Sequence, residues 1–238
     1  MGNDLHVLRN VDAVFSGVTV LEKPEDLDKH VAEFDVLYLL LHTTAESSIV
    51  DIMREASAPL LGSPQIYASS DLGLFSRFSI PASSTWALVA LKDHDVKLPS
   101  SIFYGPSSTS ASDPKLRRWL LTHRLPTSVE LTSDTFQSVM SAPQAPLVVI
   151  AAAPEAMKEK VMTRLHDVGK KWRVRTEGSG ISHGREIVFA WMDAKKWGSW
   201  MKSMYGIKVD DQHDEKDDHD DLDDVPVIIA DHSVCIFP

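Results

Sequence analysis

One short stretch of the chain is apolar almost without interruption and has polar residues on both sides. It is Asp35–His42, and the polar residues Thr43 and Thr44 follow it at once. The run is too short and too continuously apolar for an amphipathic helix, and its composition is typical of a strand buried on both faces. It therefore predicts the central strand of an α/β domain.

Strands and helices alternate around this central strand in the first half of the chain. Pro24, in a predicted first helical turn, follows the β-branched run from Val18, and Ser47-Ser48 predicts the start of the next helix. We expect further strands at Gln65–Ala68, Trp86–Leu91 and Ser101–Tyr104, a short helix from Asp71, and a closing helix at Asp113–Arg124. The Pro- and Ser-rich stretch Gly105–Ser112 is expected to be a surface loop.

The same order of elements begins again near Thr127, which indicates an internal repeat. We predict an N-terminal segment (1–17), a first domain (18–125) and a second domain (126–238) that lacks the closing helix. The second domain is expected to have strands at Val129–Leu131, Leu147–Ala152, Ile187–Met192, Val227–Ile229 and Val234–Phe237. Its helices are expected after Ser133, from Pro154 to about Lys171, and through Trp197 to Gly206, with a strand end and a loop in Trp172–Gly184.

Most of the net charge of −10 lies in one segment. Asp210–Asp224 holds ten acids and one lysine, which gives −9 and leaves −1 for the rest of the chain. A segment of this kind cannot bury apolar area and repels itself, so it is predicted to be a disordered insertion (210–224). Because no basic face is evident, we expect no nucleic-acid partner and no membrane contact. No membrane-spanning stretch or targeting signal is predicted.

The single cysteine, Cys235, limits the chemistry that the chain can perform by itself. One thiol allows no intramolecular disulfide, no dithiol pair and no cysteine-based zinc site. Cys235 lies in an apolar run and is interpreted as a buried hydrophobe, with a reactive thiol as the alternative. His213 and His219 lie in the acidic segment, which lacks the glycine and the terminal glutamate of a calcium-binding loop. No metal, no cofactor and no catalytic residue is predicted.

The repeated order of elements is that of the thioredoxin fold, and the second copy resembles a particular group of such domains. Its segments LPTSVELTSDTF (Leu125–Phe136), VFAWMDAKKWGSWMKSMYGI (Val188–Ile207) and VPVIIAD (Val225–Asp231) resemble the non-catalytic domains of fungal protein disulfide isomerase-like, transmembrane thioredoxin-related proteins. The first copy resembles them less closely, in GVTVLEKPEDL and FSI. The resemblance implies two tandem thioredoxin-like domains.

The resemblance also carries expectations about context. Members of the family reside in the endoplasmic reticulum and pair such domains with an upstream Cys-x-x-C domain, so the implied location is the endoplasmic-reticulum lumen. Val225-Pro226 matches the position of the family's cis-proline, which predicts a cis bond at Pro226, with an ordinary trans edge-strand proline as the alternative. This chain departs from the catalytic pattern, because neither turn after a central strand carries cysteine.

Aromatic and methionine side chains are concentrated in two helical segments of the second copy. In non-catalytic domains of isomerases the pocket for unfolded clients lies between the two corresponding helices, and flat aromatics and pliable methionines suit tolerant apolar binding. The alternative is ordinary core packing of an amphipathic helix. The candidate binding residues are Phe136, Met140, Trp197, Trp200, Met201 and Met204, with Trp191 and Tyr205 beside them.

These observations lead to two hypotheses of different kinds. In the first, the chain is a redox-inactive module that binds unfolded polypeptide clients, or acts as a spacer, for a disulfide isomerase-like protein. In the second, it is a structural or docking module that positions a Cys-x-x-C thioredoxin-like domain without binding clients. In neither is the chain itself an enzyme, because thiol–disulfide exchange needs a reactive thiolate beside a resolving partner.

Overall fold

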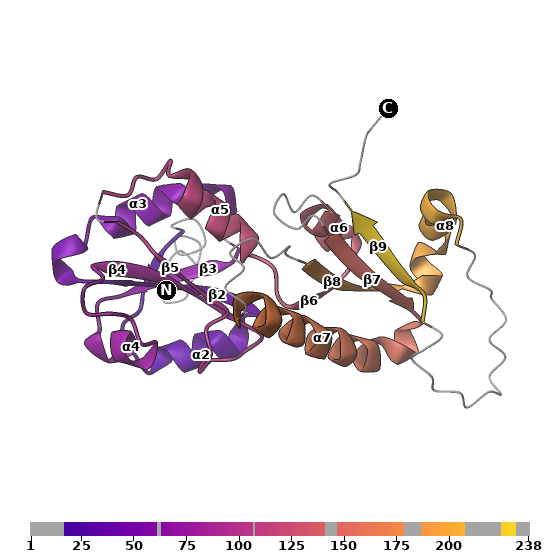
Figure 1. Ribbon diagram of the computed structural model, residues 1–238, viewed down its shortest axis with the longest axis horizontal. Coiled ribbons are helices and arrows are strands. Elements are labelled where there is room, and N and C mark those ends of the chain that lie inside the picture. Colours follow the sequence, from indigo (N-terminus) through magenta and orange to yellow (C-terminus); the bar gives the residue numbers. More distant parts are fainter. Residues whose placement is uncertain are drawn as a thin grey trace, which may run out of the picture. The chain divides into compact units, whose positions relative to one another are not determined.

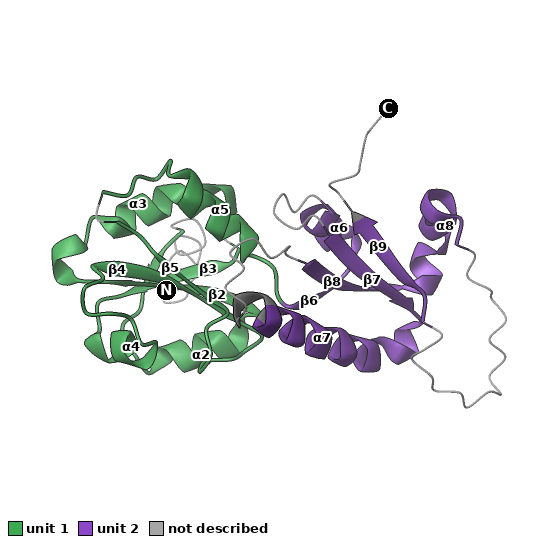
Figure 2. Ribbon diagram, in the orientation of Figure 1, with its two compact units in different colours: residues 1–126 green, residues 127–238 purple. Residues whose placement is uncertain are grey.

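The computed structural model divides the chain into two compact units, residues 1–126 and 127–238 (Figure 2). This division lies one residue from the boundary expected from the sequence. The structure describes residues 17–60, 63–106, 108–140, 147–178, 187–207 and 225–231. The N-terminal segment up to residue 16, the acidic segment 210–224, and Val234–Phe237 with Cys235 lie outside the described residues, as does any closing helix of the second unit.

Unit 1 is built on a five-stranded mixed sheet with the order β1-β3-β2-β4-β5. The first three strands in this order run parallel, and β4 and β5 are antiparallel to their neighbours. The strands are β1 (Thr19–Val20), β2 (Val36–His42), β3 (Gln65–Ser69), β4 (Trp86–Lys92) and β5 (Ser101–Tyr104). Each predicted strand is present, with ends that differ from the prediction by a residue or two.

Helices cover both faces of this sheet (Figure 1). Helices α2 (Asp26–Glu33) and α4 (Leu72–Arg77) pack on one face, and α3 (Ile49–Ala56) and α5 (Pro114–Thr122) pack on the other. Short 3₁₀ turns, η1 (Thr44–Glu46) and η2 (Ala58–Leu60), flank α3. The three-layer arrangement follows from the parallel strands, because each connection between parallel strands returns across a face of the sheet.

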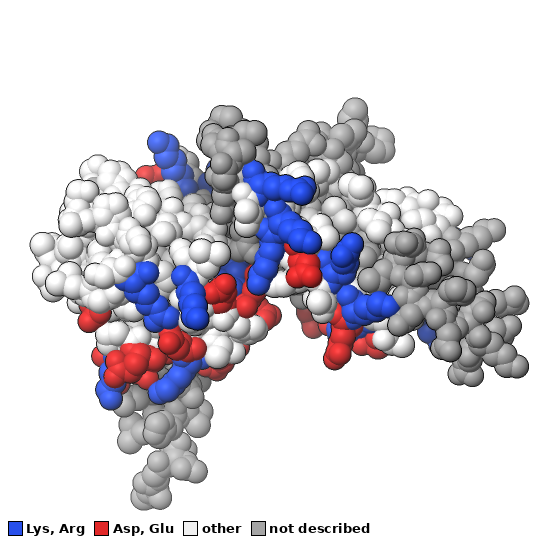
Figure 3. Space-filling model, turned by 60° about the horizontal axis from the view of Figure 1, so that its bottom comes forward, with Lys and Arg blue, Asp and Glu red and all other residues white. Residues whose placement is uncertain are grey.

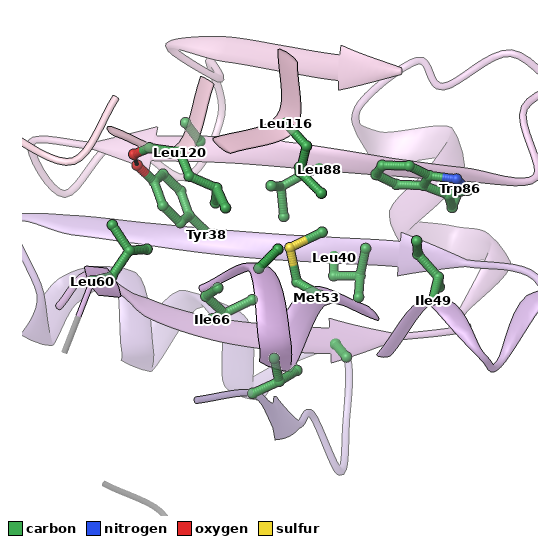
Figure 4. Close-up of a cluster of buried hydrophobic side chains, with 14 of the residues drawn as sticks. Tyr38, Leu40, Ile49, Met53, Leu60, Ile66, Trp86, Leu88, Leu116 and Leu120 are labelled. Carbon is green, nitrogen blue, oxygen red and sulfur yellow. Dashed lines mark hydrogen bonds between the residues drawn. The ribbon is translucent and has the colours of Figure 1, made fainter. Parts of the chain in front are cut away.

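The central strand β2 is buried on both faces, as its composition predicts. Leu37, Leu39 and Leu41 belong to the core under α2 and α4. Tyr38 and Leu40 point into the opposite core, under α3 and α5 (Figure 4). The buried Tyr38 hydroxyl donates a hydrogen bond of 2.6 Å to the backbone carbonyl of Leu120, which joins the end of α5 to the middle of the sheet.

The loop from Gly105 to Ser112 lies at the surface, as its composition predicts, with Pro106, Ser108, Ser110 and Ser112 exposed, but part of it packs on the core. Thr109 and Ala111 are buried, and Ala111 belongs to the core under α3 and α5. The indole Nε1–H of Trp86 donates to the carbonyl of Pro106 at 3.3 Å, and a Cβ added at Gly105 would collide with the same indole ring. The small and proline residues of this loop therefore allow the backbone to lie against Trp86.

Unit 2 repeats this plan with a sheet whose described strands are four, in the order β6-β8-β7-β9. Its strands are β6 (Ser128–Glu130), β7 (Leu147–Ala153), β8 (Ile187–Asp193) and β9 (Val227–Asp231). Only β9 is antiparallel to its neighbour. Figure 1 shows α7 (Lys158–Gly178) on one face and α6 (Ser133–Met140) and α8 (Ala194–Tyr205) on the other, with the 3₁₀ turn η3 (Glu155–Met157) before α7.

Helix α7 is longer than predicted. The expected helix end near Lys171 and the strand end expected from Trp172 are wrong, because α7 continues to Gly178. The rest of the predicted loop, residues 179–184, lies outside the described residues. The alternation of apolar and basic residues from Trp172 to Arg175 imitates the period of a strand. Lysine and arginine are nevertheless good helix formers, and no glycine or proline interrupts the segment between Gly169 and Gly178.

The hydrogen bonds at the end of each central strand confirm the internal repeat. In unit 1, His42 pairs with Trp86, and Thr43 N donates to the Thr85 carbonyl at 2.9 Å. In unit 2, Ala151 pairs with Val227, and Ala152 N donates to the Pro226 carbonyl at 3.0 Å. In both units the acceptor is the residue just before the antiparallel strand. Thr85 and Pro226 are therefore equivalent positions in the two units.

The predicted cis bond at Val225–Pro226 is wrong. Among the described residues the structure has one cis peptide bond, Ser63–Pro64, which precedes β3. Pro226 lies just before β9, which has no described strand on its outer side, and its carbonyl continues the ladder with β7. A trans peptide bond before Pro226 is therefore compatible with this position.

The contact between Gly105 and Trp86 gives a direct test of the packing of unit 1. We expect Gly105→Ala to lower the free energy of unfolding by about 1 to 3 kcal/mol, because the added methyl group overpacks the indole ring. Gly198→Ala is the matched control, because nothing lies within 4 Å of a Cβ at that position in α8. It should raise the stability by about 0.5 to 1 kcal/mol. Urea denaturation measures both, and equal effects would contradict the packing described here.

Candidate functional site

The predicted binding residues of α6 and α8 form an aromatic cluster, which we define as Phe136, Trp197, Trp200 and Tyr205. The rings of Phe136 and Trp197 are stacked, with centroids 5.3 Å apart and an interplanar angle of 14°. Trp200 meets both rings edge to face at 5.7 and 5.8 Å. Trp200 also contacts Tyr205 edge to face, with the ring centroids 5.3 Å apart. The cluster therefore joins α6 to α8 through ring contacts of favourable geometry.

The aromatic cluster is only partly covered. Phe136, Trp197 and Trp200 are half-buried, Tyr205 is 38% exposed, and Met204 on the same helix is 62% exposed. Met140, at the end of α6, is half-buried. The candidate residues other than Met201 thus keep apolar area in contact with solvent, and an exposed apolar patch of this kind marks a possible contact surface.

Two residues that the sequence places with this group lie elsewhere. Met201 is fully buried at 0% exposure, so it belongs to the core and cannot contact a ligand in this structure. Trp191 is also fully buried, and it packs with Val161 and Leu165 on the α7 side of the sheet. Alternate residues of a strand face opposite sides, so Trp191 on β8 is directed away from α6 and α8.

The ends of α8 are set by two local features. The Asp193 carboxylate accepts hydrogen bonds from the backbone N–H groups of Lys195 at 2.9 Å and Lys196 at 3.4 Å, which caps the helix. Gly206, with φ of 69°, closes it in the left-handed region. Burial alone would raise the pKa of Asp193, but the hydrogen bond from the Lys196 side chain and the two backbone donors together lower it. The cap is therefore lost only as the pH falls through this lowered pKa, below the ordinary 3.8.

The turns that follow the two central strands have similar backbones and carry no thiol. In each unit the strand leads into a 3₁₀ turn, η1 or η3, and then into a helix. In unit 2 this edge carries a charge network. The Nζ atom of Lys158 lies 2.6 Å from Oε2 of Glu130 and 3.6 Å from Oε1 of Glu155. The Nζ atom of Lys196 lies 3.3 Å from Oε2 of Glu155 and 3.2 Å from Oδ2 of Asp193. The hydrogen bond to Glu130 raises the pKa of Lys158.

Unit 1 has a cavity at the same edge, which sequence reasoning missed. Its volume is about 670 Å³. The residues that line it come from the carboxyl ends of β1, β2 and β3 and from the starts of α3 and α4: Val20, Leu21, Glu22, His42, Val50, Ala68, Ser69, Ser70, Asp71, Leu72 and Gly73. No sequence pattern marks them, because they are brought together by the parallel order of the strands.

Other kinds of site are not evident in the part of the chain that the structure describes. There, no three His, Cys, Asp or Glu side chains are grouped so that they could hold a metal ion. None of the described helices has the length and apolar character to cross a membrane. On the face drawn in Figure 3, basic and acidic side chains lie near one another at several places.

Comparison with known proteins adds to the description of the fold. No protein-family model matches the sequence, and no curated protein matches it. The crystal structure of the bb fragment of ERp72 matches with a TM-score of 0.52 at 11% identity, covering 79% of this chain and 79% of that one. The fold is thioredoxin-like. The predicted fold class is thereby confirmed.

Two further structures are similar at lower scores. A crystal structure of human ERp44 has a TM-score of 0.44 at 11% identity, over 81% of this chain and 47% of that one. The first two thioredoxin domains of Naumovozyma dairenensis Eps1p give 0.34 at 10% identity, over 76% and 75%. The chain thus spans about half the length of ERp44.

The different burial of two methionines in α8 can be tested directly. Met201→Ala should lower the free energy of unfolding by about 2 to 5 kcal/mol, because it empties a fully buried site. Met204→Ala should change it by less than about 0.5 kcal/mol, because that side chain is largely exposed. Chemical denaturation of the two variants gives the comparison. A large loss for Met204→Ala would mean that the rotation of α8 described here is wrong.

Proposed function

We propose that this chain is a redox-inactive module that binds unfolded polypeptide segments through the aromatic cluster of unit 2. The observation that carries the proposal is the partial exposure of Phe136, Trp197 and Trp200 beside the exposed Met204 and Tyr205. Apolar side chains that gather in this way at the surface of a domain are typical of a contact surface.

The chemistry of the cluster suits a tolerant site. Aromatic rings provide large, rigid contact area at a low cost in conformational entropy, and methionine adapts to ligands of different shape. The rings are arranged by their mutual contacts at 5.3 to 5.8 Å, so little ordering is required when a ligand binds. The contact area of the cluster is mainly aromatic, which favours apolar segments of varied sequence.

The cellular setting of the proposal rests on likeness. The sequence resembles non-catalytic domains of disulfide isomerase-like proteins, and the similar structures include domains of ERp72, ERp44 and Eps1p. We place the module in the endoplasmic-reticulum lumen, where it assists disulfide folding or quality control. The thiol chemistry would belong to a Cys-x-x-C domain of a partner or of a longer parent protein, and nucleic acid and membrane are not partners.

A second function is favoured by one observation. Phe136 stacks on Trp197 and also contacts Trp200, so part of the cluster serves to join α6 to α8. Under this alternative, the chain is a structural or docking module that positions an active domain and binds no clients.

A peptide titration separates the two functions. Addition of an unstructured, tryptophan-free peptide rich in leucine and phenylalanine should change the tryptophan fluorescence saturably. Trp200→Ala should weaken this binding by at least about fivefold, the effect expected of an aromatic anchor. Trp172→Ala, on α7 and outside the cluster, is the matched control and should leave the affinity unchanged. No saturable response would support the structural alternative. Equal affinity of wild type and Trp200→Ala would contradict the aromatic cluster as the binding site, because the peptide would then bind elsewhere on the chain.

The absence of a dithiol leads to a separate expectation. The chain should not accelerate the reduction of insulin by dithiothreitol above the uncatalysed rate, because Cys235 has no resolving partner within the chain. A Cys235→Ser variant should behave like the wild type. Robust turnover that is lost in Cys235→Ser would overturn the proposal of a redox-inactive module.

A further inference from the structure

We propose that the cavity of unit 1 is a second binding site, for an extended polypeptide segment that places a lysine or arginine beside an aliphatic side chain. The cavity of about 670 Å³ lies within the size range of ligand sites. It is in the other unit from the aromatic cluster and shares no residue with it. The inference therefore stands independently of the function proposed above.

Two aliphatic side chains at the cavity are unusually exposed. Val20 is 67% exposed and Leu72 is 75% exposed, and both line the same cavity together with the buried Leu21 and Ala68. Covering such side chains with an aliphatic group of a ligand would remove apolar area from water, which is the main favourable term in association.

The charged and polar groups at the cavity favour a ligand that also carries a positive charge. Glu22 and Asp71 are carboxylates, and none of the described residues that line the cavity is lysine or arginine. Asp71 uses Oδ1 to accept the backbone N–H of Leu74 at 3.1 Å, which caps α4. His42 donates Nδ1–H to the Thr43 carbonyl at 3.0 Å, which in a neutral imidazole leaves Nε2 as an acceptor. A cationic side chain complements this set of acceptors, and a phosphate or carboxylate is repelled by it.

The backbone at the cavity suits an extended segment. β1 is the first strand in the order β1-β3-β2-β4-β5, so no other described strand covers its outer edge. On its inner side, Leu21 N donates to the Ala68 carbonyl at 2.8 Å. An edge strand beside a cavity is a template for a peptide that pairs through its backbone while alternate side chains enter the cavity.

The repeat shows that this cavity depends on the residues of unit 1 and is not imposed by the fold. In unit 2 the bond from Leu131 N to the Trp191 carbonyl is equivalent to that from Leu21 N to Ala68, so Trp191 replaces Ala68. The residue before Leu131 is Glu130, which replaces Val20 and pairs with Lys158. Lys158 also lies 5.1 Å from the centre of the Trp191 ring. Unit 2 thus fills this place with an indole and an ion pair, whereas the described residues of unit 1 leave a cavity there.

Fluorescence anisotropy of two labelled peptides tests the proposal on the full chain. One probe alternates leucine and lysine, and the other has glutamate in place of lysine. The lysine probe should bind, and the glutamate probe should bind at least about tenfold more weakly. Leu72→Ser should weaken the lysine probe by about tenfold, and Glu22→Gln by about threefold. Both side chains are exposed, so neither variant should impair folding.

Matched controls locate the binding. Leu98→Ser removes a leucine of similar exposure, 69%, and Glu55→Gln removes an exposed acid, both in unit 1 and outside the cavity. Neither should change the affinity for the lysine probe, and neither should Trp200→Ala. Equal binding of the two probes, binding unaffected by Leu72→Ser, or binding lost in Trp200→Ala would overturn the proposal. The last result would also assign the peptide to the aromatic cluster and leave the function proposed above intact.

Discussion

Both units depend on a central strand that is buried on both faces. In β2 every residue from Val36 to Leu41 is buried, and β7 is buried from Ile150 to Ala153. Such a strand cannot face water, so it needs a layer of helices above and below and a neighbouring strand on each side. The parallel connections then bring loops together at the carboxyl ends of the strands. The positions of the charge network and of the cavity follow from this constraint.

The two units use the same frame for different surfaces. Where unit 1 has Ala68 and Val20 beside a cavity, unit 2 has Trp191 and Glu130 within packed and paired surroundings. Unit 2 instead presents partly exposed aromatic rings on α6 and α8. A fold of this kind hosts many functions, so the role of each unit is to be argued from these local surfaces.

Patterns that depend on local sequence predicted most of the fold. The apolar runs predicted the buried strands, and the aspartate and proline signals predicted the helix starts at Asp71 and Asp113. The errors arose where contacts between residues far apart in the sequence determine which side chains are buried. The composition of Gly105–Ser112 correctly predicts a surface loop, but it does not predict that Thr109 and Ala111 are buried or that the loop contacts Trp86. The aromatic content of β8 suggested one cluster, but the pleat of the strand directs Trp191 to the opposite face. The cavity is lined by residues from four separate segments, and no local sequence pattern predicts that these segments lie together.

The most direct test of client binding is to follow the indole Nε1–H signals of the six tryptophans by ¹⁵N NMR while an unstructured apolar peptide is added. The account predicts shifts for Trp197 and Trp200, which are half-buried in the aromatic cluster, and unchanged signals for Trp86 and Trp191, which are fully buried in the cores. Signals of Trp197 and Trp200 that stay in place at saturating peptide would contradict it.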